Sequence, residues 1–452
     1  MKKFITTLKN IWKIKELRDR IIFTLGILLV YRFGCFVVLP GVIPSVLEAA
    51  ASSGSGNDLF GLINMFTGGA FNKAAVFALG IMPYITASII IQLLGFAVPY
   101  FQRLQQREGE SGRKKINQIT RLLTVAITLV QGGAYLTWII SQGAKDPTVP
   151  MTVFWFSNVI ILSTGTIFAM WLGERITDKG IGNGISLLIM IGIIATLPGA
   201  LAYEFTNHFG LLLVLEMAAL FIVVLATVMI VQAVRRIPIQ FAKRVVGRGA
   251  NAMPAAGNRD YIPVKLNASG VMPIIFAQAI MFLPAYLLQF LAGGDGTGTG
   301  SSLLADLNDF TSAPYNIIYF FLVVLFTYIY TALMVNPQQY SEYLKRQNAF
   351  IPGIKPGKST AEFIDSVTTR ITLPGSVFLA LIAILPAFAA AFGVNLGFAL
   401  FFGGTSLLIL VGVVLDTLQQ IESYLLMRKY DGLVKSGKLK GKSGVQGIGA
   451  SM

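Results

Sequence analysis

Blocks of about 20 apolar residues recur along this sequence, and they constrain its fold more than any other feature, because a helix of about 20 residues can cross a hydrocarbon core of about 30 Å. Hydropathy, with turn residues as breaks, predicts ten such spans. They lie at 21–38, 76–98, 119–140, 153–172, 184–199, 212–233, 271–291, 315–335, 371–391 and 403–423. We therefore expect an all-α integral membrane protein with both chain ends on one side of the membrane.

Composition supports a membrane protein and argues against an enzyme. Of the 452 residues, 54% are hydrophobic and 13% charged, whereas soluble domains carry about 25% charged residues. Cys35 is the only cysteine and His208 the only histidine, which excludes a disulfide framework and a Cys/His metal site. The sequence has no nucleotide-binding, hydrolase or zinc motif, so we expect no catalysis and no cofactor.

The basic residues predict which side of the membrane holds the chain ends. Of the 36 Lys and Arg residues, 33 fall in the segments that the ten spans place on the side of the termini. Lys73 and Lys145 lie in the opposite loops, and Arg32 lies within the first span. The positive-inside rule therefore puts both termini in the cytoplasm. Topology and anionic lipid explain most of the net charge of +15, although a ribosome or another partner could also use it.

The ten spans divide the chain into two inverted halves of five helices, a plan that many transporters share. We expect a cytoplasmic amphipathic arm at 1–20, an N-terminal half at 21–200, a C-terminal half at 201–430 and a cytoplasmic tail at 431–452. Two basic cytoplasmic loops, 234–270 and 336–370, are longer than the usual 2–8 residues between helices. Their length suggests contact with a partner.

Ionisable residues within the spans are few, namely Arg32, Glu216 and Asp416. Each lies near a span end, where it can reach the interface or pair with a neighbouring helix. The lack of a midplane carboxylate cluster counts against a proton- or sodium-coupled transporter. A secondary transporter therefore remains the weaker alternative to a channel, and a non-transporting insertion scaffold is a third.

Isoleucine pairs spaced four residues apart occur in the second and fifth spans. Ile81 and Ile85 flank Pro83, which is expected to kink the second span. Ile185 and Ile189 repeat the spacing in the fifth span. Taken alone, such side chains would face lipid or a packed interior more readily than a pore.

Five long sequence blocks carry a family resemblance. They are GIMPYITASIIIQLL, REGESGRKK, WLGERITDKGIGNGIS, NPQQYSEYLKRQNAFIPGIKPG and FGGTSLLI. Together and in this order, they resemble the bacterial SecY family of protein-conducting channels, over nearly the whole chain. The resemblance implies two halves that clasp an hourglass pore. Such a pore conducts unfolded secretory chains and opens sideways, between the second and seventh helices, to release apolar segments into lipid.

In that family six apolar side chains ring the pore constriction, and the resemblance places all six on isoleucines here. They are Ile81, Ile85, Ile185, Ile189, Ile275 and Ile409. A ring of bulky apolar side chains dewets a narrow gap and blocks ions. Isoleucine is also stiff at its first side-chain torsion, which gives the ring a defined bore.

The resemblance also implies a plug and a lateral gate. The plug would be the short external helix from Asp58 to Phe71, including Asn64, with Gly68 and Gly69 as its hinge. A surface lid without a gating role is the alternative. The candidate gate residues are the polar side chains Thr86, Gln92, Gln131 and Gln278. Each could bond across the seam, at about 0.6–2 kcal/mol per contact, or simply pack between helices.

Partners follow from the same resemblance: the membrane subunits SecE and SecG, the motor ATPase SecA and the ribosome, all at a bacterial plasma membrane. The basic loops would dock SecA and the ribosome, unless they only bind anionic headgroups. The candidate docking residues are Arg235, Arg236, Lys243, Arg244, Arg248 and Lys355. The family motif GIRPG is GIKPG here, and Lys355 lacks the planar bidentate fork of arginine.

Overall fold

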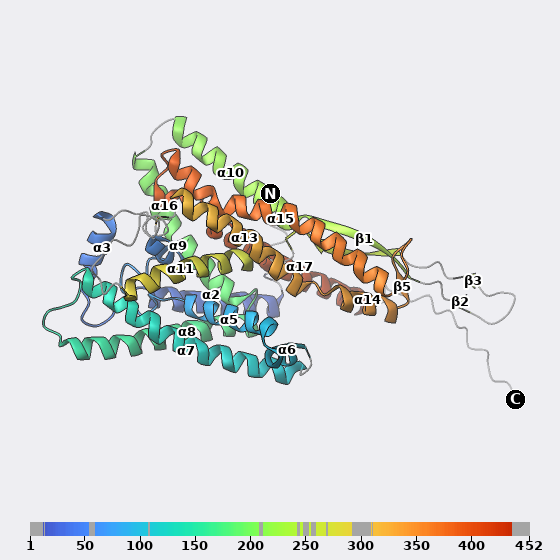
Figure 1. Cartoon of the computed structure of the whole chain (residues 1–452), viewed down its shortest axis with the longest axis horizontal. Helices are drawn as coiled ribbons and strands as arrows, with labels where there is room; N and C mark the ends of the chain where they lie inside the picture. Colours follow the sequence, from blue (N-terminus) through green and yellow to red (C-terminus); the bar gives the residue numbers. More distant parts are fainter. Residues whose placement is uncertain are drawn as a thin grey trace.

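In the computed structural model, the described residues form a bundle with a long helix at each of the ten predicted spans (Figure 1). These helices are α2 (Lys15–Gly34), α5 (Met82–Ala97), α7 (Gly109–Ser141), α8 (Met151–Lys179), α9 (Gly184–Asn207), α10 (Leu211–Gln232), α11 (Met272–Leu291), α13 (Ala313–Met334), α15 (Lys358–Ala391) and α17 (Gly404–Lys435). The structure describes residues 12, 14–53, 59–106, 109–207, 211–241, 245–246, 253–254, 259–267, 270–291, 309 and 311–435. Within these ranges, seven helices are long and apolar enough to cross a membrane, and shorter apolar helices lie at Met82–Gly95 and Met272–Met281. The prediction of an all-α protein with many spans is confirmed.

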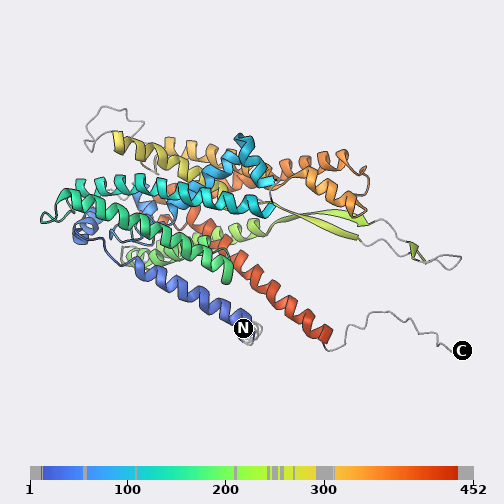
Figure 2. The same cartoon turned by 90° about the horizontal axis from the view of Figure 1, so that it is seen from below.

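The first and last helices of the bundle reach the same end of the molecule (Figure 2). α2 begins and α17 ends toward this end, which also carries the strands β1 (Val234–Phe241) and β5 (Ala349–Phe350) and the helix α14 (Pro337–Arg346). We call this the basic end, because the described Lys and Arg residues gather in its segments. The opposite end carries the short helices α3 (Pro44–Ser53) and α16 (Leu396–Ala399). An even number of spans requires this arrangement.

The two segments predicted as long loops fold into a small platform at the basic end. β1 (Val234–Phe241) pairs antiparallel with β4 (Arg259–Lys265) and with β5 (Ala349–Phe350). β2 (Val245–Val246) pairs with β3 (Met253–Pro254) further along the same segment. Seven buried side chains give the platform an apolar core of its own, namely Ile237, Ile239, Val264, Leu344, Ala349, Ile351 and Ile364. The description of 234–270 and 336–370 as loops is therefore wrong, and the alternation of apolar and polar residues in VRRIPIQF was the missed strand signal.

Several helices extend beyond the predicted spans, mostly at the basic end. α15 begins 13 residues before the predicted span, at Lys358, and α17 continues to Lys435. After α5, the short helix α6 (Pro99–Gln106) leads to α7, which begins at Gly109. Hydropathy could not locate these ends, because a helix that leaves the hydrocarbon core keeps its backbone hydrogen bonds but exchanges its apolar residues for polar ones.

A row of small polar residues lets α7 pack closely against its neighbours. Thr120, Thr124 and Thr128 are buried and lie four residues apart, on one face of the helix. Each hydroxyl donates to the carbonyl four residues earlier, at 2.6–2.9 Å, so each of the three has a hydrogen-bond partner within the helix. Small residues on a membrane helix allow close approach, and α7 packs against both α5 and α8.

The two halves are in contact along unequal seams. α17 packs along α9, whereas α11 makes much slighter contacts with α5 and α7. The extensive seam lies between the fifth and tenth membrane helices, and the slight seam lies between the second, third and seventh. Van der Waals packing holds membrane helices together, so the slight seam is held by less packing than the extensive one.

Candidate pore constriction and plug

The first two candidate ring residues lie where α5 begins. Ile81 immediately precedes Met82, the first residue of the helix, and Pro83 occupies the first turn. The predicted kink at Pro83 is wrong, because a proline in the first turn removes no intrahelical hydrogen bond. The N–H of Ile85 donates to the carbonyl of Ile81 at 3.1 Å, which puts both buried side chains on one face.

The second pair depends on the turn at 180–183, which fixes the start of α9. Three polar side chains from α2, α8 and α17 accept hydrogen bonds from backbone N–H groups in this region. They are Thr24 from Ile181 (3.1 Å), Thr177 from Gly184 (2.9 Å) and Gln420 from Gly182 (2.8 Å). Ile185 and Ile189 follow in the first two turns of α9, and Ile189 is buried.

The C-terminal half supplies the last two ring residues. Ile275 is the fourth residue of α11, after a Met-Pro pair that repeats the start of α5. Ile409 lies on α17 and is 3% exposed, whereas Ile275 is half-buried. All six isoleucines belong to one apolar cluster that includes residues of both halves.

A cavity of about 10 Å³ separates the ring from the short helix α4 (Leu59–Phe66). Its lining combines two ring residues with residues on and next to α2, α4 and α5, namely Ile81, Ile189, Tyr31, Phe66, Thr67 and Met82. This volume is at the lower limit for a single water molecule. Ile81 and Ile189 therefore lie close to Phe66 of α4, with little empty space between them.

The short helix α4 lies inside the bundle, against α9. The hydroxyl of Ser406 on α17 donates to the sulfur of Met65 at 3.4 Å, which connects α4 to the C-terminal half. α4 ends at Phe66, and Gly68 and Gly69 follow with φ angles of +65° and +87°. These left-handed angles favour glycine, so the chain turns sharply at the expected hinge. Asp58 lies outside the described residues.

Hydrogen bonds bridge the two hinge glycines. The side-chain oxygen of Asn64 accepts from the N–H of Asn72 at 3.0 Å, and the hydroxyl of Thr67 accepts from the N–H of Phe71 at 3.3 Å. Phe71 itself is fixed in the N-terminal half, because its carbonyl accepts from the hydroxyl of Tyr135 at 2.6 Å and its ring packs at a tilt against the Tyr135 ring. Phe71, the C-terminal limit of the predicted plug, is therefore attached to α7 of the N-terminal half.

Arg32 and Gly192 also meet at this hinge, and the sequence placed neither of them there. The sequence predicts that Arg32 snorkels or joins an ion pair, but its guanidinium donates to the carbonyl of Gly68 at 2.6 Å. An ionisable residue within a span was a usable signal for Arg32. Gly192 had no such signal, because only the fold brings the α9 backbone against the end of α4.

The four candidate gate residues lie on α5, α7 and α11, the helices of the slight seam. The hydroxyl of Thr86 donates to the carbonyl of Met82 at 3.0 Å, and the amide of Gln92 donates to the hydroxyl of Ser88 at 3.2 Å. Both bonds stay within α5. Gln131 is half-buried on α7 and Gln278 is buried on α11. Hydrogen bonding across the seam therefore stays a prediction.

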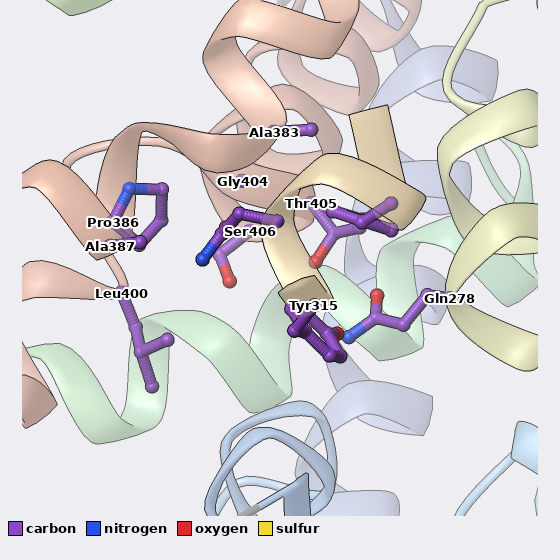
Figure 3. A pocket seen from close by; sticks show the side chains of 11 residues that line it. Gln278, Tyr315, Ala383, Pro386, Ala387, Leu400, Gly404, Thr405 and Ser406 are labelled. Atoms are coloured by element: carbon purple, nitrogen blue, oxygen red, sulfur yellow. The ribbon is translucent and has the colours of Figure 1, made fainter. Parts of the chain in front are cut away.

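Gln278 lines a polar cavity of about 30 Å³ inside the C-terminal half (Figure 3). The other polar residues around it come from α13 and α17 and are Tyr315, Asn316, Tyr319, Thr405 and Ser406. Such a volume accepts one or two water molecules. Ser406 also contacts Met65 of α4, so this polar cavity adjoins the candidate plug. No sequence pattern pointed to it, because its polar residues are scattered over apolar spans.

The basic end exposes three of the six candidate docking residues. Arg235 and Arg236 project from β1, and the guanidinium of Arg236 lies 4.8 Å from the ring centre of Tyr261. Lys355 is exposed in the turn between β5 and α15. Lys243, Arg244 and Arg248 lie outside the described residues.

Comparison with known sequences identifies relatives over nearly the full length. The sequence model of the SecY family matches residues 75–418. The protein translocase subunit SecY of Streptomyces coelicolor is 42% identical, across 95% of this chain and 100% of the relative. The corresponding subunit of Chlamydia muridarum is 38% identical, across 97% of this chain and 100% of the relative.

Solved structures show the same fold. One described as the structure of a protein conducting channel matches with a TM-score of 0.63 at 18% identity, over 93% of this chain and 94% of that chain. A SecY structure described by a plug domain that stabilises the closed state matches at 0.61, with the same identity and coverage. Sec61 in a canine ribosome-channel complex matches at 0.59 and 16% identity, over 93% and 94% of the two chains.

Proposed function

The chain belongs to the SecY family and is a protein-conducting channel subunit rather than an enzyme, and from this premise we propose that unfolded secretory chains pass through the ring of six isoleucines. One observation carries the proposal: the six side chains come from both halves and share one apolar cluster with the residues of α4. Family membership sets aside the transporter and the insertion scaffold.

The ring would act as a hydrophobic seal around the passing chain. Bulky apolar side chains exclude water from a narrow gap and so block ions, yet they offer a passing polypeptide no fixed hydrogen bonds. The chain has no catalytic group in this role, so the energy for movement would come from SecA or from elongation on the ribosome. At rest, α4 would plug the outer side of the ring, and the residues that follow Gly69 would stay fixed to the N-terminal half.

Lateral release would use the slight seam. α5 and α7 would part from α11, while the extensive packing of α17 along α9 keeps the halves together. Thr86, Gln92, Gln131 and Gln278 would then face the opened seam. Thr86 and Gln92 would keep their hydrogen bonds within α5 when the seam parts.

Crosslinking to a stalled secretory chain tests the pore directly. A photoreactive side chain at Ile81 or Ile275 should crosslink to the mature part of the stalled chain, because both positions would line its path. The matched control is Ile160 of α8, an isoleucine that is 61% exposed on the outside of the bundle. Equal crosslinking from Ile160, or none from both ring positions, would contradict the pore assignment.

The basic end would face the cytoplasm of a bacterium, in the plasma membrane. This orientation follows from the 33 basic residues of the terminal side. A tag after Met452 should therefore be labelled only after the cells are permeabilised. A tag inserted at Gly143, in the turn between α7 and α8 at the other end of the bundle, should be labelled in intact cells. Labelling of the Met452 tag from outside would refute the orientation.

The platform at the basic end would dock partners. Exposed arginines suit the phosphates of a ribosome and the carboxylates of a protein, and the neighbouring Sec61 structure is described in a ribosome-channel complex. We assign SecA to the same face, SecE and SecG to the membrane around the bundle, and anionic lipid headgroups to the remaining basic residues. Arg235, Arg236 and Lys355 are the described docking residues; Lys243, Arg244 and Arg248 complete the set.

Lys355→Glu is expected to weaken SecA and ribosome binding by about tenfold to a hundredfold, as the loss of one or two hydrogen bonds to charged groups would. The turn is held in place, because Ser341 donates to the carbonyl of Gly357 at 2.6 Å and Thr360 to that of Lys355 at 2.9 Å. Insertion and pore closure should be unchanged. Lys355→Arg should hold or strengthen binding, since arginine can form two parallel bonds.

The measurement is SecA and ribosome binding to purified channel, with translocation assayed in parallel. Lys358→Glu is the matched control, because Lys358 is exposed nearby on α15 but pairs with Glu362. If only surface charge mattered, both variants would lose the same affinity, and Lys355→Ala would cost about 1 kcal/mol of lipid attraction. Normal binding with Lys355→Glu would rule out a docking role for this residue.

A further inference from the structure

Arg32 contacts the hinge of α4 from within a membrane helix. It lies in the last turn of α2, and its Nη1 atom donates to the carbonyl of Gly68 at 2.6 Å. An ionised side chain within a span is costly, and where it occurs it usually has a function. Neither the ring nor the seam uses Arg32, so its role has to be sought at this contact.

The acceptor is a carbonyl group at the end of a helix. Carbonyls in and beyond the last turn lack intrahelical donors and carry negative partial charge. Gly68 lies two residues after Phe66, where α4 ends. The guanidinium therefore satisfies an acceptor that the helix cannot satisfy itself, through a charge-assisted hydrogen bond that is about twice as strong as a neutral one.

Gly192 of α9 forms the other side of this contact. A Cβ atom added to Gly192 would lie 2.2 Å from the carbonyl oxygen of Phe66. A Cβ atom added to Gly68 would lie 2.6 Å from the Nη1 atom of Arg32 and 3.0 Å from the Cα atom of Gly192. The end of α4 is thus held between the guanidinium and the bare backbone of α9.

Lys73 provides a comparison within the same chain. The guanidinium of Arg32 and the ammonium of Lys73 lie 5.0 and 4.4 Å from the ring centre of Phe36. Both cations therefore share one aromatic neighbour. Among the hydrogen bonds described for this region, the side chain of Arg32 is the one that reaches the carbonyl of the hinge.

We propose that Arg32 is the positioning residue that holds α4 in the closed channel. Its hydrogen bond to the carbonyl of Gly68, here called the latch, keeps the end of α4 against the backbone of Gly192, here called the seat. The inference rests on the proposed function, in which α4 plugs the pore. Displacing α4 breaks this hydrogen bond and exposes the guanidinium to water. Arg32 therefore contributes to the free energy needed to open the channel. Because its acceptor is a backbone carbonyl, the latch does not depend on the side chains of α4.

The test replaces Arg32 and measures both ion leak and the position of α4. Purified channel, with the subunits that copurify, is placed in vesicles. Met65→Cys with Ser406→Cys reports α4 through a short thiol crosslinker, and the buried Cys35, which neighbours Arg32, is left in place. Arg32→Gln should raise the displaced fraction about tenfold, the effect of losing one hydrogen bond to a charged group. The leak should rise and the crosslink yield should fall, whereas Arg32→Lys should recover part of both.

Lys73→Gln is the matched control, and it should leave both measurements at the wild-type value. Unchanged leak and crosslink yield in Arg32→Gln would overturn the proposal. A leak that persists in the crosslinked fraction would overturn it too, because α4 would then be in place while ions pass elsewhere.

A second pair of variants keeps the proposal testable if Arg32→Gln fails to insert. Gly192→Ala places a methyl group against the carbonyl of Phe66 and should displace α4 while Arg32 is intact. Gly199→Ala, on the same helix, meets no atom within 4 Å and should have no effect. Equal behaviour of the two variants would contradict the seat on α9.

Deletion of α4 distinguishes an error in the role assigned to Arg32 from an error in the plug assignment. If the deletion leaks and Arg32→Gln does not, the plug assignment stands and only the latch is wrong. If the deletion does not leak, the plug assignment is wrong and the latch falls with it, whatever Arg32→Gln shows.

Discussion

Replacing Ile85, Ile189 and Ile275 together with serine is expected to make the resting membrane leak ions. The three positions lie on α5, α9 and α11, so the change opens the ring in both halves. Serine removes most of the side-chain volume and adds a hydroxyl that binds water, which hydrates a gap that isoleucine keeps dry. Each loss of about 1.4 kcal/mol from the barrier raises the passage rate about tenfold.

Single-channel conductance of the purified triple variant in a planar bilayer checks this expectation. The matched control replaces the same three residues with valine, which stays apolar and stiff and loses one methylene per site, so the valine variant should remain closed. Correct insertion is verified by the yield of folded channel, because large-to-small changes in a core cost about 2–5 kcal/mol each. Wild-type conductance in the serine variant would refute the role of these isoleucines as the seal.

Deleting residues 59–66, the helix α4, is expected to give a channel that inserts normally but closes poorly. The segment is too short to span the membrane, so its loss removes no helix of the bundle. It does remove Met65 and Phe66, whose side chains lie in the central cluster beside the ring. The seal would then depend on the ring alone, and defective signal sequences would open the channel more easily.

A longer deletion, from Asp58 to Phe71, is the informative comparison. It also removes Phe71, whose ring lies 4.7 Å from that of Tyr135 and 5.1 Å from that of Trp138, centre to centre. Loss of a buried phenylalanine costs about 3–5 kcal/mol, so the longer deletion should reduce the yield of folded protein. Both variants are measured for resting conductance and for export of a reporter with a defective signal sequence. If the shorter deletion fails to insert, α4 is structural and the plug assignment is wrong.

The sequence predicted the spans well and their ends poorly. Each of the ten apolar blocks coincides with a helix, because an apolar stretch in lipid must satisfy its backbone hydrogen bonds internally. The errors have two causes. α5 begins at Met82 instead of 76, because the apolar residues 76–81 form turns buried inside the bundle. α15 begins at Lys358 instead of 371, because its polar first turns lie beyond the apolar stretch. Outside the hydrocarbon core, hydropathy no longer distinguishes a helix from a turn or a strand, and the platform around β1 was missed for this reason.

The candidate site was predicted in part. The identities of the ring isoleucines came from motif resemblance, since their spacing alone suits a lipid-facing or a packed helix equally well. Gly68 and Gly69 were recognised as a break, because paired glycines interrupt a helix. The attachment of Phe71 to α7 and the polar cavity beside Gln278 were not foreseen, because both depend on contacts between segments far apart in the chain.

The sequence by itself determined the class of the protein, the number of spans and the side that holds the basic residues. These properties depend on local quantities, namely apolar length and the placement of charge, which lipid selects directly. Only the tertiary structure decided which backbone groups meet. The contact of Arg32 with the carbonyl of Gly68, and of Gly192 with the carbonyl of Phe66, joins three segments that no periodicity relates. A backbone carbonyl is the same in every residue, so no residue type marks it as an acceptor until the fold places a donor against it.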